Sequence, residues 1–136
     1  MVESSSLSDP ILVAWVEIMK EYPSIPGGAK IPLGRECIAF YKYDGTQIRI
    51  EFSRKRGWYK FGTRRRLLDE TDSEYGSAIP LFSETYADDL AKIFTDTKEF
   101  RGVDHFIAYC EWFGPHSLGC WYDFSEPHEL MLIDVD

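Results

Sequence analysis

The sequence predicts an α+β domain built on antiparallel strands. Two segments, 46–53 and 58–61, are rich in β-branched and aromatic residues and are joined by a turn signal, as neighbouring antiparallel strands are. One segment that begins at Ser83 or Glu84 has the apolar spacing of an amphipathic helix. The chain has 136 residues, of which 44% are hydrophobic, so we expect one globular domain over residues 1–136 with a core of its own.

The first predicted elements precede residue 43. Residues 9–21 predict a helix that Asp9 caps and in which Pro10 suits the first turn. Prolines and glycines between residues 23 and 32 then predict an extended connection. The apolar run that follows predicts a strand over 36–42.

The strand predicted over 46–53 shows the clearest alternation. Three apolar residues alternate with three polar ones, so we expect one face of this strand to be buried and the other to be solvated. The dipeptide Asp44-Gly45 is typical of a hairpin turn and would join this strand to the one over 36–42. The apolar set is Ile48, Ile50 and Phe52, and the polar set is Gln47, Arg49 and Glu51.

The second half of the chain predicts one helix and two further strands. After an acidic loop over 69–76, the helix carries a stripe of four apolar residues and ends before Arg101 and Gly102. Residues 106–113 are apolar on both faces and predict a central strand, and residues 130–135 predict the last strand. The stripe consists of Tyr86, Leu90, Ile93 and Phe94.

Composition restricts the compartment. No apolar run approaches the ~20 residues that a membrane helix needs, and the acidic, polar N-terminus is unlike a secretory signal. Three cysteines fit a reducing compartment better than a disulfide framework. We therefore expect a cytoplasmic protein.

Positive charge is concentrated in one part of an acidic chain. The net charge is −8, yet residues 42–66 contain nine Lys/Arg and only two Asp/Glu. Such a segment predicts a surface suited to phosphates, and a solvated basic hairpin is an equally weighted alternative.

Two charged residues adjoin apolar runs. Lys42 ends the run over 37–41, and Glu111 lies inside the run over 106–114. A charge held in a buried strand is costly unless it has a partner or a task. For Glu111 the alternatives are a buried ion pair with a nearby arginine and a carboxylate that faces a pocket.

Four short patterns follow one another along the chain: Lys42-x-Asp44-Gly45, FGTR over 61–64, YCEWFG over 109–114 and LMLIDV over 130–135. In this order they resemble the motifs of ATP-dependent RNA ligases of the phage kind. Lys42-x-Asp44-Gly45 resembles the nucleotide-accepting motif, and the run YCEWFG over 109–114 resembles the third motif, an apolar strand that ends in Gly-Glu-aromatic-aromatic-Gly. The run FGTR over 61–64 resembles the arginine motif between them, and LMLIDV over 130–135 resembles the motif that follows. The resemblance covers the chain from Lys42 onward. It implies the N-terminal portion of an antiparallel-sheet, ATP-grasp-like nucleotidyltransferase domain.

The resemblance also implies roles, with ATP and Mg²⁺ as cofactors and RNA ends as partners. Lys42 would attack the α-phosphorus of ATP and hold AMP as a phosphoramidate, and Glu111 would accept a hydrogen bond from the ribose. Asp44 would order the loop, and Gly45 would let the backbone approach the nucleotide. Arg64 would contact the nucleotide or the RNA end.

Two positions depart from the family pattern. Gln47 stands where DNA ligases and capping enzymes carry an arginine, which favours an RNA ligase. Ile133 stands where an aromatic residue stacks on the base, so Trp121 or Tyr122 would have to supply that ring.

Family members carry two further motifs downstream, a metal-binding glutamate and a pair of lysines that contact the α-phosphate. Neither pattern occurs by residue 136. The alternatives to an active ligase are therefore a non-catalytic remnant that binds nucleotide or RNA, and half of a split enzyme completed by a separately encoded C-terminal partner. No metal ligand is assigned.

Other candidates are weaker. Cys110, His116 and Cys120 lack the Cys-x-x-Cys spacing of a zinc site. Basic residues near aromatic ones suggest contacts to RNA, although a strand core is the more frequent use of such aromatic residues. The basic set is Arg54, Lys55, Arg56 and Arg65, and the aromatic set is Trp58, Tyr59 and Phe61.

Overall fold

The structure is a computed structural model that describes residues 22–23, 34, 36, 38–39, 41–117 and 122–136. The chain divides into two compact units, Met1–Glu36 and Cys37–Asp136. The helix predicted over 9–21 and nearly all of the connection over 23–32 lie outside the described residues. The second unit contains every helix and strand described below.

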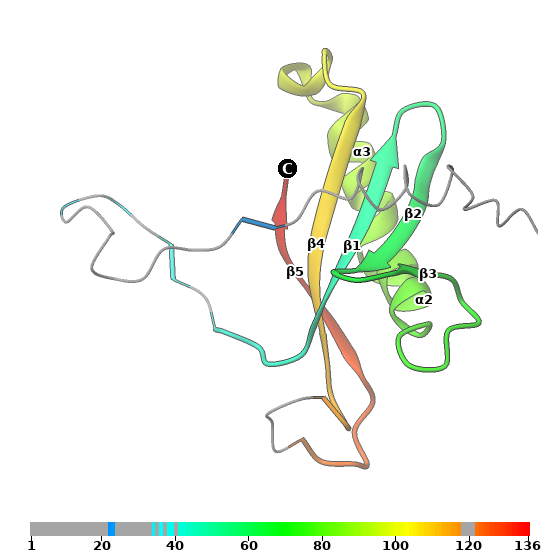
Figure 1. Ribbon diagram of the computed structural model, residues 1–136. Coiled ribbons are helices and arrows are strands. Elements are labelled where there is room, and N and C mark those ends of the chain that lie inside the picture. Colours follow the sequence, from blue (N-terminus) through cyan, green and yellow to red (C-terminus); the bar gives the residue numbers. More distant parts are fainter. Residues whose placement is uncertain (1–21, 24–33, 35, 37, 40, 118–121) are drawn as a thin grey trace, which may run out of the picture. The chain divides into compact units, whose positions relative to one another are not determined.

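This unit is a five-stranded antiparallel sheet with one long helix, which confirms the predicted α+β class (Figure 1). The strand order is β3-β2-β1-β4-β5, so the two longest strands, β1 and β4, are central neighbours. The strands are β1 (Thr46–Ser53), β2 (Gly57–Thr63), β3 (Leu67–Leu68), β4 (His105–Phe113) and β5 (Glu129–Val135).

The helix begins earlier than predicted. It runs through α2 (Ala78–Phe82), a wider π-helical turn (Ser83–Ala87) and α3 (Asp88–Asp96), and a short 3₁₀ turn follows at Lys98–Phe100. The prediction of a start at Ser83 or Glu84 is wrong because Pro80 is compatible with a first turn. The N–H groups of a first turn have no partner within the helix, so a proline there loses little.

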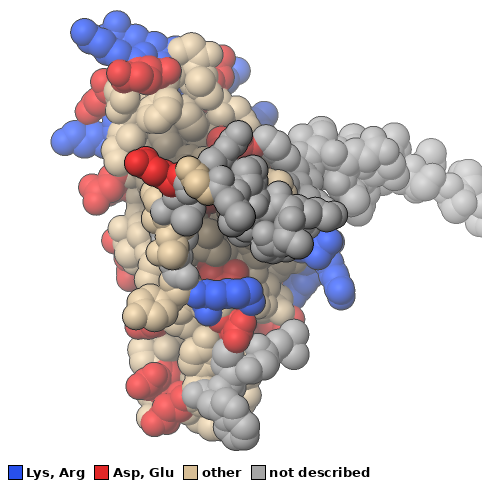
Figure 2. Space-filling model, turned by 90° about the vertical axis from the view of Figure 1, so that its left-hand side faces the viewer, with Lys and Arg blue, Asp and Glu red and all other residues tan. Residues whose placement is uncertain are grey.

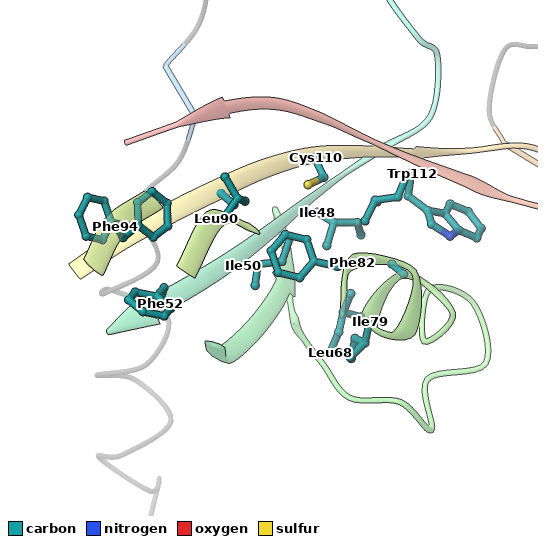
Figure 3. Packing of buried hydrophobic residues seen from close by; sticks show 14 residues of the cluster. Ile48, Ile50, Phe52, Leu68, Ile79, Phe82, Leu90, Phe94, Cys110 and Trp112 are labelled. Atoms are coloured by element: carbon teal, nitrogen blue, oxygen red, sulfur yellow. The ribbon is translucent and has the colours of Figure 1, made fainter. Parts of the chain in front are cut away.

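The helix packs on one face of the sheet. Leu90 and Phe94 of the predicted stripe are buried, as is Phe82, whereas Ile93 is 48% exposed. Figure 3 shows these helix residues facing the apolar side chains of the strands. The core residues that β1 and β4 contribute are Ile48, Ile50, Phe52, Phe106, Ala108, Cys110 and Trp112.

The π-helical turn fixes the helix to β2 and β5, the strands that flank the central pair β1 and β4. The Tyr86 hydroxyl donates a hydrogen bond to the carbonyl of Leu130 at 3.1 Å and accepts one from the N–H of Leu132 at 3.3 Å, both in β5. The indole Nε1 of Trp58, in β2, donates to the carbonyl of Ala87 at 2.9 Å. The rings of Trp58 and Phe61 lie 4.7 and 6.2 Å from that of Phe82, so both belong to the core.

The opposite face of β1 is also buried, contrary to prediction. Arg49 and Glu51 are only 3% and 4% exposed. Glu51 forms an ion pair with Lys60 of β2 at 2.8 Å and accepts a hydrogen bond from the Tyr59 hydroxyl at 2.9 Å. Arg49 donates to the carbonyl of Thr63 at 2.6 Å. Alternation predicted a solvated face, but charges that have such partners can be buried.

Candidate functional site

The candidate site begins with the loop before β1. None of the described residues between 36 and 42 belongs to a strand, so the strand predicted over 36–42 is wrong there. Ile38 and Tyr41 are 81% and 89% exposed. Because a short apolar run forms a strand only where a neighbouring strand pairs with it, the pattern alone was insufficient. It follows that Asp44 and Gly45 lead into β1 and do not form a hairpin turn.

Lys42 lies in this loop and not at the end of a buried strand. Its side chain is 89% exposed, and its Nζ lies 3.1 Å from Oδ1 of Asp44. The interpretation of Lys42 as a charge held at the end of a buried strand is therefore wrong. The described structure instead presents Lys42 to solvent beside a carboxylate.

Glu111 of β4 accepts a hydrogen bond from this loop. It lies half-buried in β4 between Gln47 of β1 and Met131 of β5, and its Oε1 accepts a hydrogen bond from the backbone N–H of Gly45 at 3.0 Å. Among the described residues, no arginine forms an ion pair with Glu111. The hydrogen bond from Gly45 joins two sites that are 66 residues apart in the chain.

The pKa of Glu111 is also affected by the residues of this loop. Burial raises this pKa above 4.5, while the hydrogen bond from Gly45 and the positive charge of Lys42 oppose the rise, and the charge of Asp44 adds to it. The charges of Lys42 and Asp44 therefore both influence the pKa of Glu111. The structure brings together four of the residues that the motifs singled out.

Gly45 is needed because the loop lies directly against β4. A Cβ atom at this position would lie 2.1 Å from the carbonyl oxygen of Trp112 and 2.8 Å from Cβ of Phe113. The resemblance implied a glycine that lets the backbone approach a nucleotide closely. In the structure the close neighbour is the backbone of the protein itself.

Arg64 lies toward the same end of the sheet as Glu111, whereas Ile133 lies level with the middle of β4. Arg64 is exposed in the turn after β2, one residue beyond Thr63, which pairs with Ile48 next to Gln47. Ile133, 36% exposed, is the extra residue of a bulge in β5, two positions from the partner of Glu111. These placements follow from the strand register and involve no direct contact with Glu111.

Aromatic side chains pack around the loop, which the sequence did not indicate. The rings of Tyr43 and Phe113 stack with centroids 4.5 Å apart and an angle of 17° between their planes. The Tyr122 hydroxyl donates to the carbonyl of Asp44 at 3.0 Å, and its ring lies 5.8 Å from that of Phe113. A cavity of about 330 Å³ adjoins these rings, and its lining consists of Phe113, Gly114, Tyr122, Glu126, Pro127 and Glu129.

The nine basic residues of 42–66 do not form the single surface that was predicted. Arg49 and Lys60 are buried, and Arg66 pairs with Asp72 and Glu74 and lies over the ring of Tyr75. On the face in Figure 2, blue and red side chains lie interspersed. Several of the nine basic residues thus act within the fold, and no uniform phosphate-binding patch results on this face.

The residues predicted to bind RNA fall into two groups. Arg54 donates to the carbonyls of Val103, Phe94 and Phe100 at 2.6 to 2.7 Å, so its guanidinium holds the end of the helix region. Lys55, Arg56 and Arg65 are exposed, and the Arg56 guanidinium lies 5.2 Å above the ring of Tyr59. Only this second group stays available for a phosphate backbone.

Metal ligands do not gather in the described part of the chain. Its residues contain no group of three or more His, Cys, Asp or Glu that could hold an ion. Cys110 is buried in the core, and burial raises the pKa of its thiol to about 12, which disfavours the thiolate that zinc requires. Cys120, which the zinc hypothesis also named, and Trp121, suggested as a ring that stacks on the base, lie outside the described residues. No helix of the described residues is long and apolar enough to cross a membrane.

Comparison of the chain with protein-family models, curated proteins and solved structures gave no match.

Proposed function

We propose that this chain is a nucleotidyltransferase of the ATP-dependent RNA ligase type, with Lys42 as the residue that accepts AMP. The observation that carries the proposal is the hydrogen bond from the N–H of Gly45 to Oε1 of Glu111 at 3.0 Å. It joins the two most specific motifs of the sequence, Lys42-x-Asp44-Gly45 and YCEWFG over 109–114. The spacing of these motifs in the chain does not require them to be in contact.

The proposed chemistry begins with ATP. The amine of Lys42 loses a proton and attacks the α-phosphorus, a nitrogen–phosphorus bond forms, the bond to the bridging oxygen breaks, and pyrophosphate leaves. Glu111 uses Oε1 for Gly45, and its second oxygen, Oε2, serves as the acceptor for a ribose hydroxyl. Arg64, toward the same end of the sheet, contacts the nucleotide or the RNA end that accepts AMP in the next step.

Magnesium has no ready-made protein site in the described residues. Mg²⁺ is commonly held by one or two carboxylates together with waters and the phosphates of a substrate. In this proposal the ion therefore arrives with the phosphates of ATP, and no step is assigned to it.

One observation favours a second candidate function, the binding of nucleotide or RNA without covalent transfer. The side chain of Lys42 is 89% exposed, and enclosure is one of the means by which enzymes activate a lysine. A separately encoded C-terminal partner would supply that enclosure in a split ligase. The test must therefore separate three outcomes.

The test is incubation with Mg²⁺ and α-labelled ATP, followed by denaturation and location of the label. We expect a label on Lys42 that survives alkali and is lost in acid, as a phosphoramidate is. Lys42→Ala should take none, and Lys55→Ala should label like the unchanged protein because Lys55 is an exposed lysine in the β1–β2 turn.

Binding of ATP without covalent label would favour the second candidate. Label that forms only after the neighbouring gene product is added would identify a split enzyme. Neither label nor binding under any of these conditions would rule out the proposal.

A further inference from the structure

The loop that carries Lys42 is held by more than the hydrogen bond to Glu111. We propose that Tyr43, Phe113 and Tyr122 form an aromatic clamp, a set of positioning residues that fixes this loop and so sets the direction from which Lys42 reaches a nucleotide. The inference rests on the proposed function of Lys42, and it assigns a positioning role to Tyr43 and Phe113 and a role other than base stacking to Tyr122.

The alternation of side chains along the loop supports the clamp. Lys42 pairs with Asp44, two residues later, at 3.1 Å, while the ring of Tyr43 between them stacks on Phe113 at 4.5 Å. The side chains of Lys42 and Asp44 therefore lie together, while the ring of Tyr43 between them packs on the last residue of β4.

The clamp has a rigid anchor. Phe113 is 5% exposed and ends β4, a central strand, so its backbone is held by the sheet and its ring has little exposed surface. Tyr122 adds a second point of attachment, because its hydroxyl binds the carbonyl of Asp44 at 3.0 Å while its ring lies 5.8 Å from Phe113. Together with the N–H of Gly45 on Glu111, three successive residues of the loop are tied down.

Such attachment matters for a nucleophile that burial does not hold. Displacing a reacting group by about 1 Å costs up to ~100-fold in rate. Since the Lys42 side chain is 89% exposed, its place depends on its own backbone. The clamp restricts the position of Lys42, as burial of the side chain would in an enclosed site.

The neighbouring tyrosine provides a matched control. Tyr41 flanks Lys42 on its other side and is 89% exposed, so Tyr41→Ala changes the same residue type without touching the clamp. Tyr43→Phe keeps the stacked ring, and Tyr122→Phe removes only a hydroxyl.

The experiment measures the rate at which Lys42 is adenylylated at saturating ATP, and the ATP concentration that gives half of that rate. We expect Tyr122→Phe to lower the saturated rate about 2- to 10-fold, the equivalent of one hydrogen bond, and Tyr43→Ala to lower it about 10-fold or more. Tyr43→Phe should restore the rate, Tyr41→Ala should leave it unchanged, and the half-saturating concentration should stay the same in all four variants.

Two results would overturn the clamp: an effect of Tyr41→Ala equal to that of Tyr43→Ala, or a change confined to the half-saturating concentration. If the unchanged protein takes no AMP under any of the conditions given above, the proposed function fails, and amide hydrogen exchange at Gly45 then judges the clamp alone. Faster exchange in Tyr43→Ala and Tyr122→Phe than in the unchanged protein supports it, and equal exchange overturns it.

Discussion

Two lysine–carboxylate pairs, one in the sheet and one in the loop before β1, have similar contact distances and opposite surroundings. Lys60 and Glu51 lie 2.8 Å apart with side chains that are both 5% exposed. Lys42 and Asp44 lie 3.1 Å apart with side chains that are 89% and 49% exposed. The comparison teaches that the contact distance of an ion pair says little about its role, whereas burial separates a pair that belongs to the fold from one that is open to a substrate.

The buried pair is supported by further partners. The second oxygen of Glu51, Oε2, accepts a hydrogen bond from Tyr59 at 2.9 Å and lies 3.3 Å from Nε2 of His105. These contacts offset the desolvation that both charges undergo, and desolvation by burial, together with Glu51, raises the pKa of Tyr59 to about 12. Tyr59 therefore stays protonated over the physiological range and keeps donating to Glu51.

The largest effect that we predict is the removal of one member of the buried pair. Lys60→Met should lower the free energy of unfolding by about 3–5 kcal/mol because it leaves the Glu51 carboxylate buried without its cation. Lys42→Met should change it by less than ~1 kcal/mol, as exposed pairs do. Urea unfolding followed by tryptophan fluorescence measures both.

The double variant Lys60→Met/Glu51→Gln is the control for this prediction. Removing both charges should recover most of the loss, since no unpaired charge is then left in the sheet. Equal losses in Lys60→Met and Lys42→Met would contradict the distinction between the two pairs.

A smaller effect should distinguish two adjacent basic residues of the β1–β2 turn. Arg54→Ala removes hydrogen bonds to three backbone carbonyls near the end of the helix, so we expect a loss of about 2–3 kcal/mol. Lys55→Ala should cost less than ~0.5 kcal/mol because this side chain is exposed. Thermal unfolding of both variants provides the measurement, and the reverse order of the two losses would show that Arg54 does not hold the helix.

The third prediction concerns the point where the loop meets β4. Gly45→Ala places a Cβ atom 2.1 Å from the carbonyl oxygen of Trp112, so the loop must move away from the strand. We expect a loss of about 1–3 kcal/mol in the free energy of unfolding and slower adenylylation of Lys42. Gly102→Ala is the matched control, since nothing lies within 4 Å of the added carbon there. Unfolding and labelling results like those of Gly102→Ala would mean that the loop tolerates the displacement.

The sequence predicted those parts of the fold in which a local period matches the burial. The alternation of β1, the apolar run of β4 and the helical positions Leu90 and Phe94 all correspond to buried faces of the structure. Burial of Arg49 and Glu51 was not predictable, because alternation shows which residues share a face and not what covers it.

The candidate site depends on the pairing of β1 with β4, which the spacing of apolar residues does not predict. Gly45 meets Glu111 because β4 pairs with β1, although the helix separates these strands in the chain. The motifs singled out both residues, but their order and spacing did not predict that the two would be in contact. The apolar run before Lys42 suggested a strand, but a run of five residues does not say whether a neighbouring strand will pair with it.

The smallest predicted effect tests whether the exposed pair acts on Glu111. Burial raises the pKa of Glu111 above its ordinary 4.5, so the folded state holds this proton more tightly than the unfolded state. The stability that the protonated group contributes is present below about pH 4.5 and is lost as the pH rises through the folded pKa. The free energy of unfolding, taken relative to Glu111→Gln, should therefore fall across that interval and stay level above it.

Lys42→Met should sharpen this result. The charge of Lys42 lowers the pKa of Glu111, so its removal should move the titration of Glu111 to higher pH, whereas Lys55→Met should leave it in place. A carbon NMR titration of the Glu111 carboxyl group measures the displacement directly. An unchanged titration of Glu111 in Lys42→Met would show that the charge of Lys42 does not act on Glu111.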